Sequence, residues 1–234
     1  MNVVVTAGPT REFIDPVRFL SNPSTGKMGF AVAAAAARRG HDVTLVAGPV
    51  ALKTPKGVRR VDVVSARDML AAVEDALASG PAGEPAAFVS TAAVADWRPA
   101  TCAAKKLKKR EMRGVLRLVR NPDVLKTVRT KLRRAKKANV ALVGFAAETD
   151  DVLAEAARKC REKGLAFIVA NDVTEKGCGF GTDTNRVTFV FPDGAQRKLP
   201  LMSKARVASE IVRETCAALR RAGEPARRKG ERWG

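Results

Sequence analysis

At 234 residues, the chain is long enough to bury a full core and to form one α/β domain, or at most two small ones. It has no uncharged apolar run near 18 residues and no basic-then-apolar leader, which argues against a membrane segment and a signal peptide. The formal net charge of +19 leaves open a basic surface for nucleic acid or for anionic small molecules.

Predicted strands and helices alternate along the chain. Apolar runs predict strands at residues 2–6, 42–47, 58–64, 86–91, 140–145 and 166–170. Apolar periodicity and end signals predict helices at residues 30–39, 65–78, 121–137, 151–163 and 203–220. Residues 115–119 are expected to pair locally, and 186–191 with 196–199 predict a hairpin.

This order predicts the α/β class, with a doubly wound, mainly parallel, Rossmann-like sheet that carries helices on both faces. We expect one domain at residues 1–220 and a basic, disordered tail at residues 221–234.

The connection between the first strand and the first helix, residues 7–29, carries the clearest functional signal. A strand-to-helix connection in an α/β protein usually needs about 2 to 6 residues, whereas this one is much longer, polar and rich in Gly and Pro. Its small-residue end meets a helix start, where free backbone N–H groups favour an anion. The plain alternative is a surface loop.

Other polar motifs also follow predicted strands, at residues 92–98, 145–149 and 171–172. Ligands in doubly wound folds bind beyond the carboxyl ends of the strands. The sequence therefore predicts a single site at that edge of the sheet.

Cysteine and histidine usage argues against two kinds of site. Cys102, Cys160, Cys178 and Cys216 are widely spaced with no CxxC pair, as expected for free thiols in a reducing cytoplasm. His41, the single histidine, follows a predicted helix end, so we expect a structural role and no Ser-His-Asp or Cys-His mechanism.

The positive charge is concentrated at residues 105–137, which hold fifteen Lys or Arg against Glu111 and Asp123. A basic nucleic-acid-binding α/β module is therefore the alternative function. This run contains no aromatic residue on which a base could stack, so we favour a solvated basic face that serves anionic small substrates.

Two common nucleotide motifs do not fit. A dinucleotide site would need GxGxxG after the first strand, where Ala7-Gly8-Pro9-Thr10 stands instead. The Gly26-Lys27 pair lacks the P-loop's following Ser or Thr, since Met28 stands there, and Ser21 replaces the P-loop's first Gly. A nucleotide or phosphate site of another design remains.

Six motifs occur in the order of a known family: residues 6–12, 21–29, 92–99, 121–123, 144–149 and 170–173. With them the chain resembles phosphopantothenoylcysteine synthetase, the ligase of coenzyme A biosynthesis, over residues 2 to about 215. The resemblance implies that 4′-phosphopantothenate reacts with CTP to give an acyl-cytidylate and pyrophosphate. L-cysteine then captures this intermediate and releases CMP.

The resemblance also implies the partners. Mg²⁺ is expected and a flavin is not, and a separate flavin-dependent decarboxylase would act on the product. A cytoplasmic homodimer is expected, with its subunit contact at residues 171–190 in a C-terminal hairpin that acts as a dimerisation arm. Neither a membrane nor nucleic acid is an expected partner.

The resemblance assigns the site residues. Asn22 and Lys106 would be catalytic, Asn22 would help cysteine capture the intermediate, and Asp96 would lie near the ribose and metal. The substrate-binding residues would be Asn22, Ala92 and Ala93. The nucleotide-binding residues would be Gly8, Ser24, Gly26, Lys27, Gly29, Ala92, Asp96, Lys106, Pro122, Asp123, Val124, Leu125, Phe145, Lys159 and Lys163.

Overall fold

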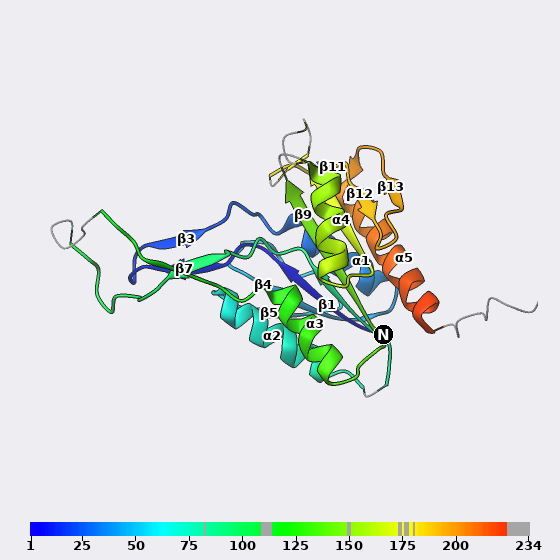
Figure 1. The fold of residues 1–234 in the computed structure, drawn as a ribbon, viewed down its shortest axis with the longest axis horizontal. Coiled ribbons are helices and arrows are strands. Elements are labelled where there is room, and N and C mark those ends of the chain that lie inside the picture. The colour runs from blue at the N-terminus through cyan, green and yellow to red at the C-terminus, as the bar shows by residue number, and fades with distance from the viewer. Residues whose placement is uncertain are drawn as a thin grey trace, which may run out of the picture.

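A central eight-stranded sheet organises the fold, with strand order β13-β12-β10-β9-β6-β1-β4-β5 (Figure 1). The computed structural model describes residues 1–81, 83–108, 114–148, 151–172, 175, 178–179 and 181–223. The sheet strands are β1 (Asn2–Ala7), β4 (Asp42–Ala47), β5 (Val58–Asp62), β6 (Ala86–Ser90), β9 (Val140–Glu148), β10 (Phe167–Asp172), β12 (Thr188–Val190) and β13 (Gln196–Lys198). The six strands from β5 to β10 are parallel, and the hairpin β12–β13 adds to β10 antiparallel. The predicted mainly parallel sheet is confirmed.

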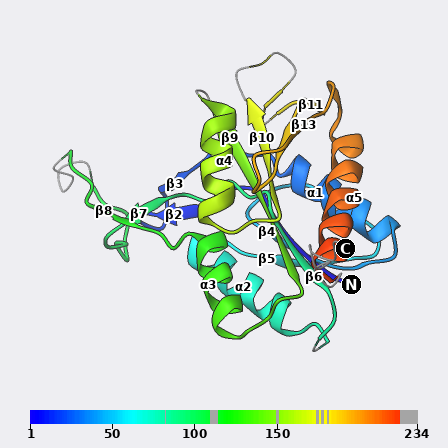
Figure 2. The ribbon, with the colours of Figure 1, turned by 45° about the vertical axis from the view of Figure 1, so that its right-hand side comes forward.

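Helices cover both faces of this sheet (Figure 2). They are α1 (Lys27–Arg38), α2 (Ala66–Ala78), α3 (Val124–Arg134), α4 (Val152–Glu162) and α5 (Lys204–Gly223). The α1 and α5 helices pack together on one face, while α2, α3 and α4 share a separate core on the other. The doubly wound arrangement is thereby confirmed. Within the described residues, no helix is long and apolar enough to cross a bilayer.

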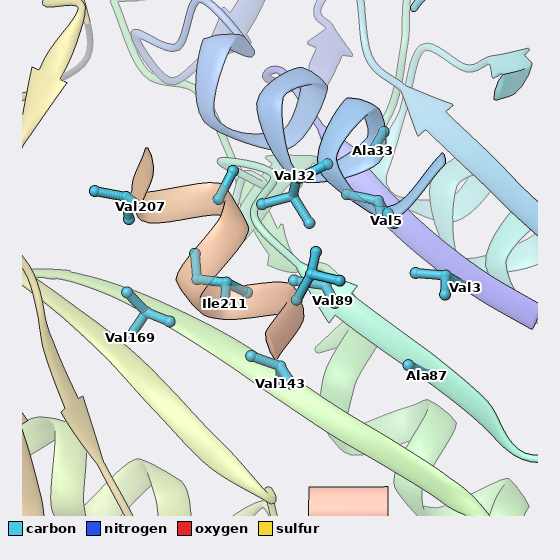
Figure 3. Close-up of a cluster of buried hydrophobic side chains, with 14 of the residues drawn as sticks. Val3, Val5, Val32, Ala33, Ala87, Val89, Val143, Val169, Val207 and Ile211 are labelled. Atoms are coloured by element: carbon cyan, nitrogen blue, oxygen red, sulfur yellow. The ribbon is translucent and has the colours of Figure 1, made fainter. Parts of the chain in front are cut away.

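The two cores follow from strand alternation, because successive side chains of a strand point to opposite faces. In β1, Val3 and Val5 join the core under α1 and α5, whereas Val4 joins the opposite one. Figure 3 shows Val32 of α1 and Ile211 of α5 over the first of these faces.

An arm projects from one end of the sheet (Figure 1). We define the arm as residues 11–21, 97–108 and 114–120. It contains two antiparallel pairs, β2 (Arg11–Phe13) with β3 (Phe19–Ser21) and β7 (Trp97–Pro99) with β8 (Leu118–Arg120). The local pairing predicted at residues 115–119 corresponds to β8, but the β2–β3 pair inside the long connection was not predicted.

Three boundaries differ from the prediction. The α1 helix begins at Lys27 rather than residue 30, because Gly26 takes a left-handed conformation (φ 75°) that turns the chain directly into the helix. The α5 helix continues to Gly223, so the predicted disordered tail cannot begin at residue 221. The rest of that tail, residues 224–234, lies outside the described residues.

The predicted dimerisation segment, residues 171–190, contains strands that pair with other strands of the same chain. Strand β12 pairs with β10 on one side and β13 on the other, so it has no free edge for a second chain. Nearby, β11 (Thr184–Asn185) pairs with β14 (Met202–Ser203) of the same chain. The predicted subunit contact at residues 171–190 stays a prediction, although β12 offers no free edge for it; residues 173–174, 176–177 and 180 of the segment lie outside the described residues.

Candidate functional site

The site lies at the topological switch point of the sheet, where β1 has β4 on one side and β6 on the other. Beyond the ends of β1 and β6, the backbone N–H of Ala93 donates to the carbonyl of Gly8 over 2.9 Å. A cavity of about 470 Å³ opens there, lined mainly by residues 22–29 and 91–94. The structure thus has a cavity at the edge of the sheet where the sequence predicted a site.

The start of α1 forms one wall of the cavity. Gly26 is buried and packs against the backbone of Gly8, which is also left-handed (φ 76°). The hydroxyl of Ser24 accepts a hydrogen bond from the N–H of Gly26 at 3.4 Å. The first turn, residues 27–29, lines the cavity and carries no acidic residue. A helix start of this kind favours an anion.

Gly29 allows α1 to approach the ends of β1 and β6. A Cβ atom at this position would lie 2.5 Å from both Ala7 Cβ and Thr91 Oγ1. We expect Gly29→Ala to lower the free energy of unfolding by about 1–3 kcal/mol through overpacking, and to weaken anion binding at the displaced helix start. Chemical denaturation measures the first effect. Gly181→Ala is the control, because a Cβ there meets nothing within 4 Å; equal losses in both variants would contradict the prediction.

Asn22 lines the cavity and contacts the loop formed by residues 92–96. Its Nδ2 donates to the carbonyl of Val94 at 3.1 Å and, over a longer 3.5 Å, to that of Ala93. The loop is also held from behind, since the side chain of Asn121 donates to Ala95 O at 2.8 Å. The Asn22 amide therefore has a fixed orientation beside the predicted acyl site.

Asp96 is exposed and lines the same cavity. The N–H of Asn121 donates to its backbone carbonyl at 2.8 Å, which fixes the turn that presents the carboxylate. The described residues contain no cluster of three His, Cys, Asp or Glu ligands. A single carboxylate still fits Mg²⁺ at a nucleotide site, where phosphates and water supply most ligands.

The cavity brings together ten of the predicted site residues. These are Asn22, Ser24, Gly26, Lys27, Gly29, Ala92, Ala93, Asp96, Phe145 and Lys159. The other seven, Gly8, Lys106, Pro122, Asp123, Val124, Leu125 and Lys163, do not line it.

The residues at the start of α3 have clear structural roles. Val124 and Leu125 are buried in the core under α2, α3 and α4. Asp123 accepts from the N–H of Lys126 at 3.0 Å, which caps α3, and its carboxylate lies 2.7 Å from Nζ of Lys163, the residue that follows α4. This ion pair ties the start of α3 to α4. The predicted base pocket between this region and Phe145 remains a prediction.

Lys106 lies on the arm. Its neighbour Leu107 donates through its N–H to the Asp15 carboxylate at 3.2 Å and accepts from Arg18 through its carbonyl at 2.9 Å. Asp15 is fully buried, and hydrogen bonding from the Arg18 guanidinium holds the pKa of this carboxyl well below its usual range. This pairing fixes residue 107 against residues 15–18, and Lys106 beside it does not line the cavity.

Among the cavity residues to which sequence reasoning gave no role, three are buried and polar. Lys204 and Asn185 come from the C-terminal part of the chain, and both are more than nine-tenths buried. Asn171 was noted after a strand but given no role, and its buried Oδ1 has no hydrogen-bond partner within the described residues. One signal was present for Lys204, because it shares a helical face with the apolar Val207 and Ile211.

Comparisons with known proteins show the family to which the chain belongs. The profile of the family described as "DNA/pantothenate metabolism flavoprotein C-terminal domain" matches residues 1–219, and the chain belongs to this family. The coenzyme A biosynthesis bifunctional protein CoaBC of Bacillus subtilis is 48% identical over 95% of this chain and 53% of its own length. CoaBC of Escherichia coli K12 is 45% identical over 92% of this chain and 51% of its own length. The chain therefore spans about half the length of these curated relatives.

Solved structures show the same fold. The crystal structure of a C-terminal domain of CoaBC has a TM-score of 0.75 and 41% identity, and the match covers 94% of this chain and 95% of that one. A Cab2 mutant in complex with phosphopantothenate-cysteine has a TM-score of 0.71 at 16% identity, covering 94% of this chain and 86% of that one. At this low identity the second match supports the fold alone.

Proposed function

We propose that the chain is a phosphopantothenate–cysteine ligase of coenzyme A biosynthesis that uses CTP and Mg²⁺. The observation that carries the proposal is the cavity, in which the start of α1, Asn22 and the 92–96 loop meet at the switch point of the sheet. The 41% identity to a solved C-terminal domain of CoaBC, over nearly all of both chains, supports it.

The first proposed step joins two anions. A carboxylate oxygen of 4′-phosphopantothenate attacks the α-phosphorus of CTP, and the bond from that phosphorus to the leaving pyrophosphate breaks. The N–H groups of residues 27–29 and the ammonium groups of Lys27 and Lys159 would balance the phosphate charge. Asp96 would hold Mg²⁺, which supplies further neutralisation when bound.

In the second proposed step, the amine of L-cysteine attacks the acyl carbon of the mixed anhydride. The bond between this carbon and the phosphate oxygen breaks, CMP leaves, and the amine loses a proton. Negative charge develops on the acyl oxygen during attack, and a neutral amide donor such as Asn22 can stabilise it.

The direct experiment mixes the protein with CTP, Mg²⁺, 4′-phosphopantothenate and L-cysteine. We expect pyrophosphate and CMP in equal amounts, together with phosphopantothenoylcysteine detected by mass spectrometry. Omission of phosphopantothenate should abolish pyrophosphate release. A complete mixture that yields no pyrophosphate would contradict the proposal.

A second candidate function is nucleic-acid binding. A basic groove of about 310 Å³ lies between α3 and α4, and its lining includes Lys126, Arg129, Arg133, Arg161 and Lys163 with the single acid Glu162. Such a groove can hold phosphates, but its lining contains no aromatic residue for a base. Salt-sensitive DNA or RNA binding without pyrophosphate formation would favour this second function.

We also propose that the ligase acts as a homodimer through the arm rather than through residues 171–190. The arm exposes a group of large apolar side chains, including Val17 (56% exposed), Trp97 (45%) and Leu118 (41%). Clustered exposed apolar side chains typically mark a protein–protein contact. The cytoplasmic location and the separate decarboxylase remain predictions from the resemblance.

The dimer proposal predicts a change in sedimentation. The wild type should sediment as a dimer at micromolar concentration, and Leu118→Glu should shift it toward monomer because a carboxylate is costly to bury in an apolar contact. Leu201→Glu is the matched control, since Leu201 is 44% exposed but lies off the arm. A monomeric wild type, or a dimer that only Leu201→Glu disrupts, would contradict the placement.

A further inference from the structure

Lys204, the first residue of α5, is a buried lysine that lines the cavity. Its exposed fraction is 7%, which is unusual for a lysine that has no acidic partner. Three residues further on, Val207 packs in the core on the same helical face. The start of α5 therefore carries the ammonium group inward, toward the ligand space.

The partners of this ammonium do not balance its charge. Its Nζ donates to the backbone carbonyl of Gly179 at 2.9 Å, and no carboxylate of the described residues forms a salt bridge with it. Asp183 is nearby, but its carboxylate lies 2.8 Å from Lys27 Nζ and is 88% exposed. Two ammonium groups thus share one exposed acid.

The pKa of Lys204 also indicates that its positive charge is not balanced. Burial lowers the pKa of Lys204 from its ordinary value, the Lys27 ammonium lowers it further, and Asp183 offsets only part of this shift. Both effects mean that, in the free protein, no nearby negative charge balances the charged form of Lys204. An anion bound in the cavity would provide that negative charge.

The position of Lys204 identifies the anion by its chemistry. Lys27 and Lys204 line one cavity together with the start of α1, and the hydroxyl and amide groups of Ser24 and Asn22 line it too. Two lysines beside a helix start suit a chain of linked phosphates better than a single carboxylate, because each phosphate brings its own charge.

We propose that Lys204 is a polyphosphate-binding residue, which acts with Lys27 on the phosphate chain of the nucleoside triphosphate. The assignment rests on the proposed function for the identity of the nucleotide, but not for the binding of a linear polyphosphate. One N–H of the ammonium remains on Gly179, and the others donate to phosphate oxygens.

The test uses the full chain and inorganic tripolyphosphate, with binding measured by titration calorimetry at low salt. Lys204→Gln should weaken binding about tenfold or more, the loss of one charge-assisted contact, and Lys204→Arg should restore part of it. Lys56→Gln removes the same charge from an exposed loop position and should stay within about twofold of the wild type. In turnover assays, Lys204→Gln should raise KM for CTP and leave KM for cysteine unchanged.

Each other outcome has a defined meaning. If Lys204→Gln binds tripolyphosphate as tightly as the wild type and only its melting temperature falls, Lys204 merely holds Gly179 and the proposal is wrong. Lys204→Met, which keeps the aliphatic stem, replaces Lys204→Gln if that variant does not fold. A wild type that does not bind tripolyphosphate also overturns the proposal. If tripolyphosphate binding depends on Lys204 but the protein makes no pyrophosphate, the ligase function is refuted and the polyphosphate site is not.

Discussion

Asn22→Ala should lose ligation while it continues to release pyrophosphate and to form the acyl-cytidylate. Loss of one donor to a developing oxyanion typically costs about 10²–10³ in rate, and this donor is needed mainly for amine attack. In the structure, Asn22 Nδ2 donates to the carbonyl of Val94 at 3.1 Å and, over a longer 3.5 Å, to that of Ala93; amine attack would exchange the longer contact for one to the acyl oxygen.

Quenched-flow sampling with mass spectrometry should therefore find the intermediate accumulating in Asn22→Ala and not in the wild type. Asn139→Ala is the control, because Asn139 is an exposed asparagine next to the start of β9, at the opposite end of the sheet. If the first step is lost as strongly as the second and no intermediate is found, Asn22 has another role.

CTP should exceed ATP in specificity constant by roughly a hundredfold or more. Buried polar groups that the wrong base leaves unpaired cost about 1–3 kcal/mol each, and about 1.4 kcal/mol corresponds to a factor of ten, so two such groups suffice. Phe145 lines the cavity and can stack on a base, and a pocket shaped for cytosine excludes the larger adenine.

Steady-state assays with each nucleotide measure this preference. Lys27→Ala should raise KM for both nucleotides without changing which base is preferred, because Lys27 lines the cavity and a lysine that binds phosphates responds to their charge and not to the base. Equal use of ATP and CTP by the wild type would contradict the prediction. A reversed preference in Lys27→Ala would show that Lys27 contacts the base.

The sequence predicted those parts of the site that follow directly from a strand end. Asn22, Gly26 and Asp96 each stand in a motif beyond β1 or β6, and parallel strands bring their carboxyl ends to one edge. The path of the arm could not be predicted from the positions of strand ends. Its β2–β3 pair is short and not alternating enough to stand out inside a Gly- and Pro-rich connection.

Lys204 could not be predicted as a cavity residue for a different reason. The chain has 43 Lys and Arg residues, and a lysine at a helix start is ordinarily solvated. Only the packing of α5 against α1 brings Lys204 to the cavity, and that packing depends on contacts between segments far apart in the sequence. Similarly, Val124 and Leu125 directly follow the family motif at residues 121–123, but burial under α2, α3 and α4 determines where they lie.

The place of β1 in the middle of the sheet has a consequence for how the chain folds. Val4 pairs with Thr44 on one side and with Phe88 on the other, and among the strands of this sheet β1 waits longest during synthesis for its second neighbour. Until β6 emerges from the ribosome, one edge of β1 remains open to pairing with other chains. Sheets built from such distant pairings fold slowly. Aggregation of nascent chains should therefore depend more on residues 2–7 than on the edge strand β13, which adds last.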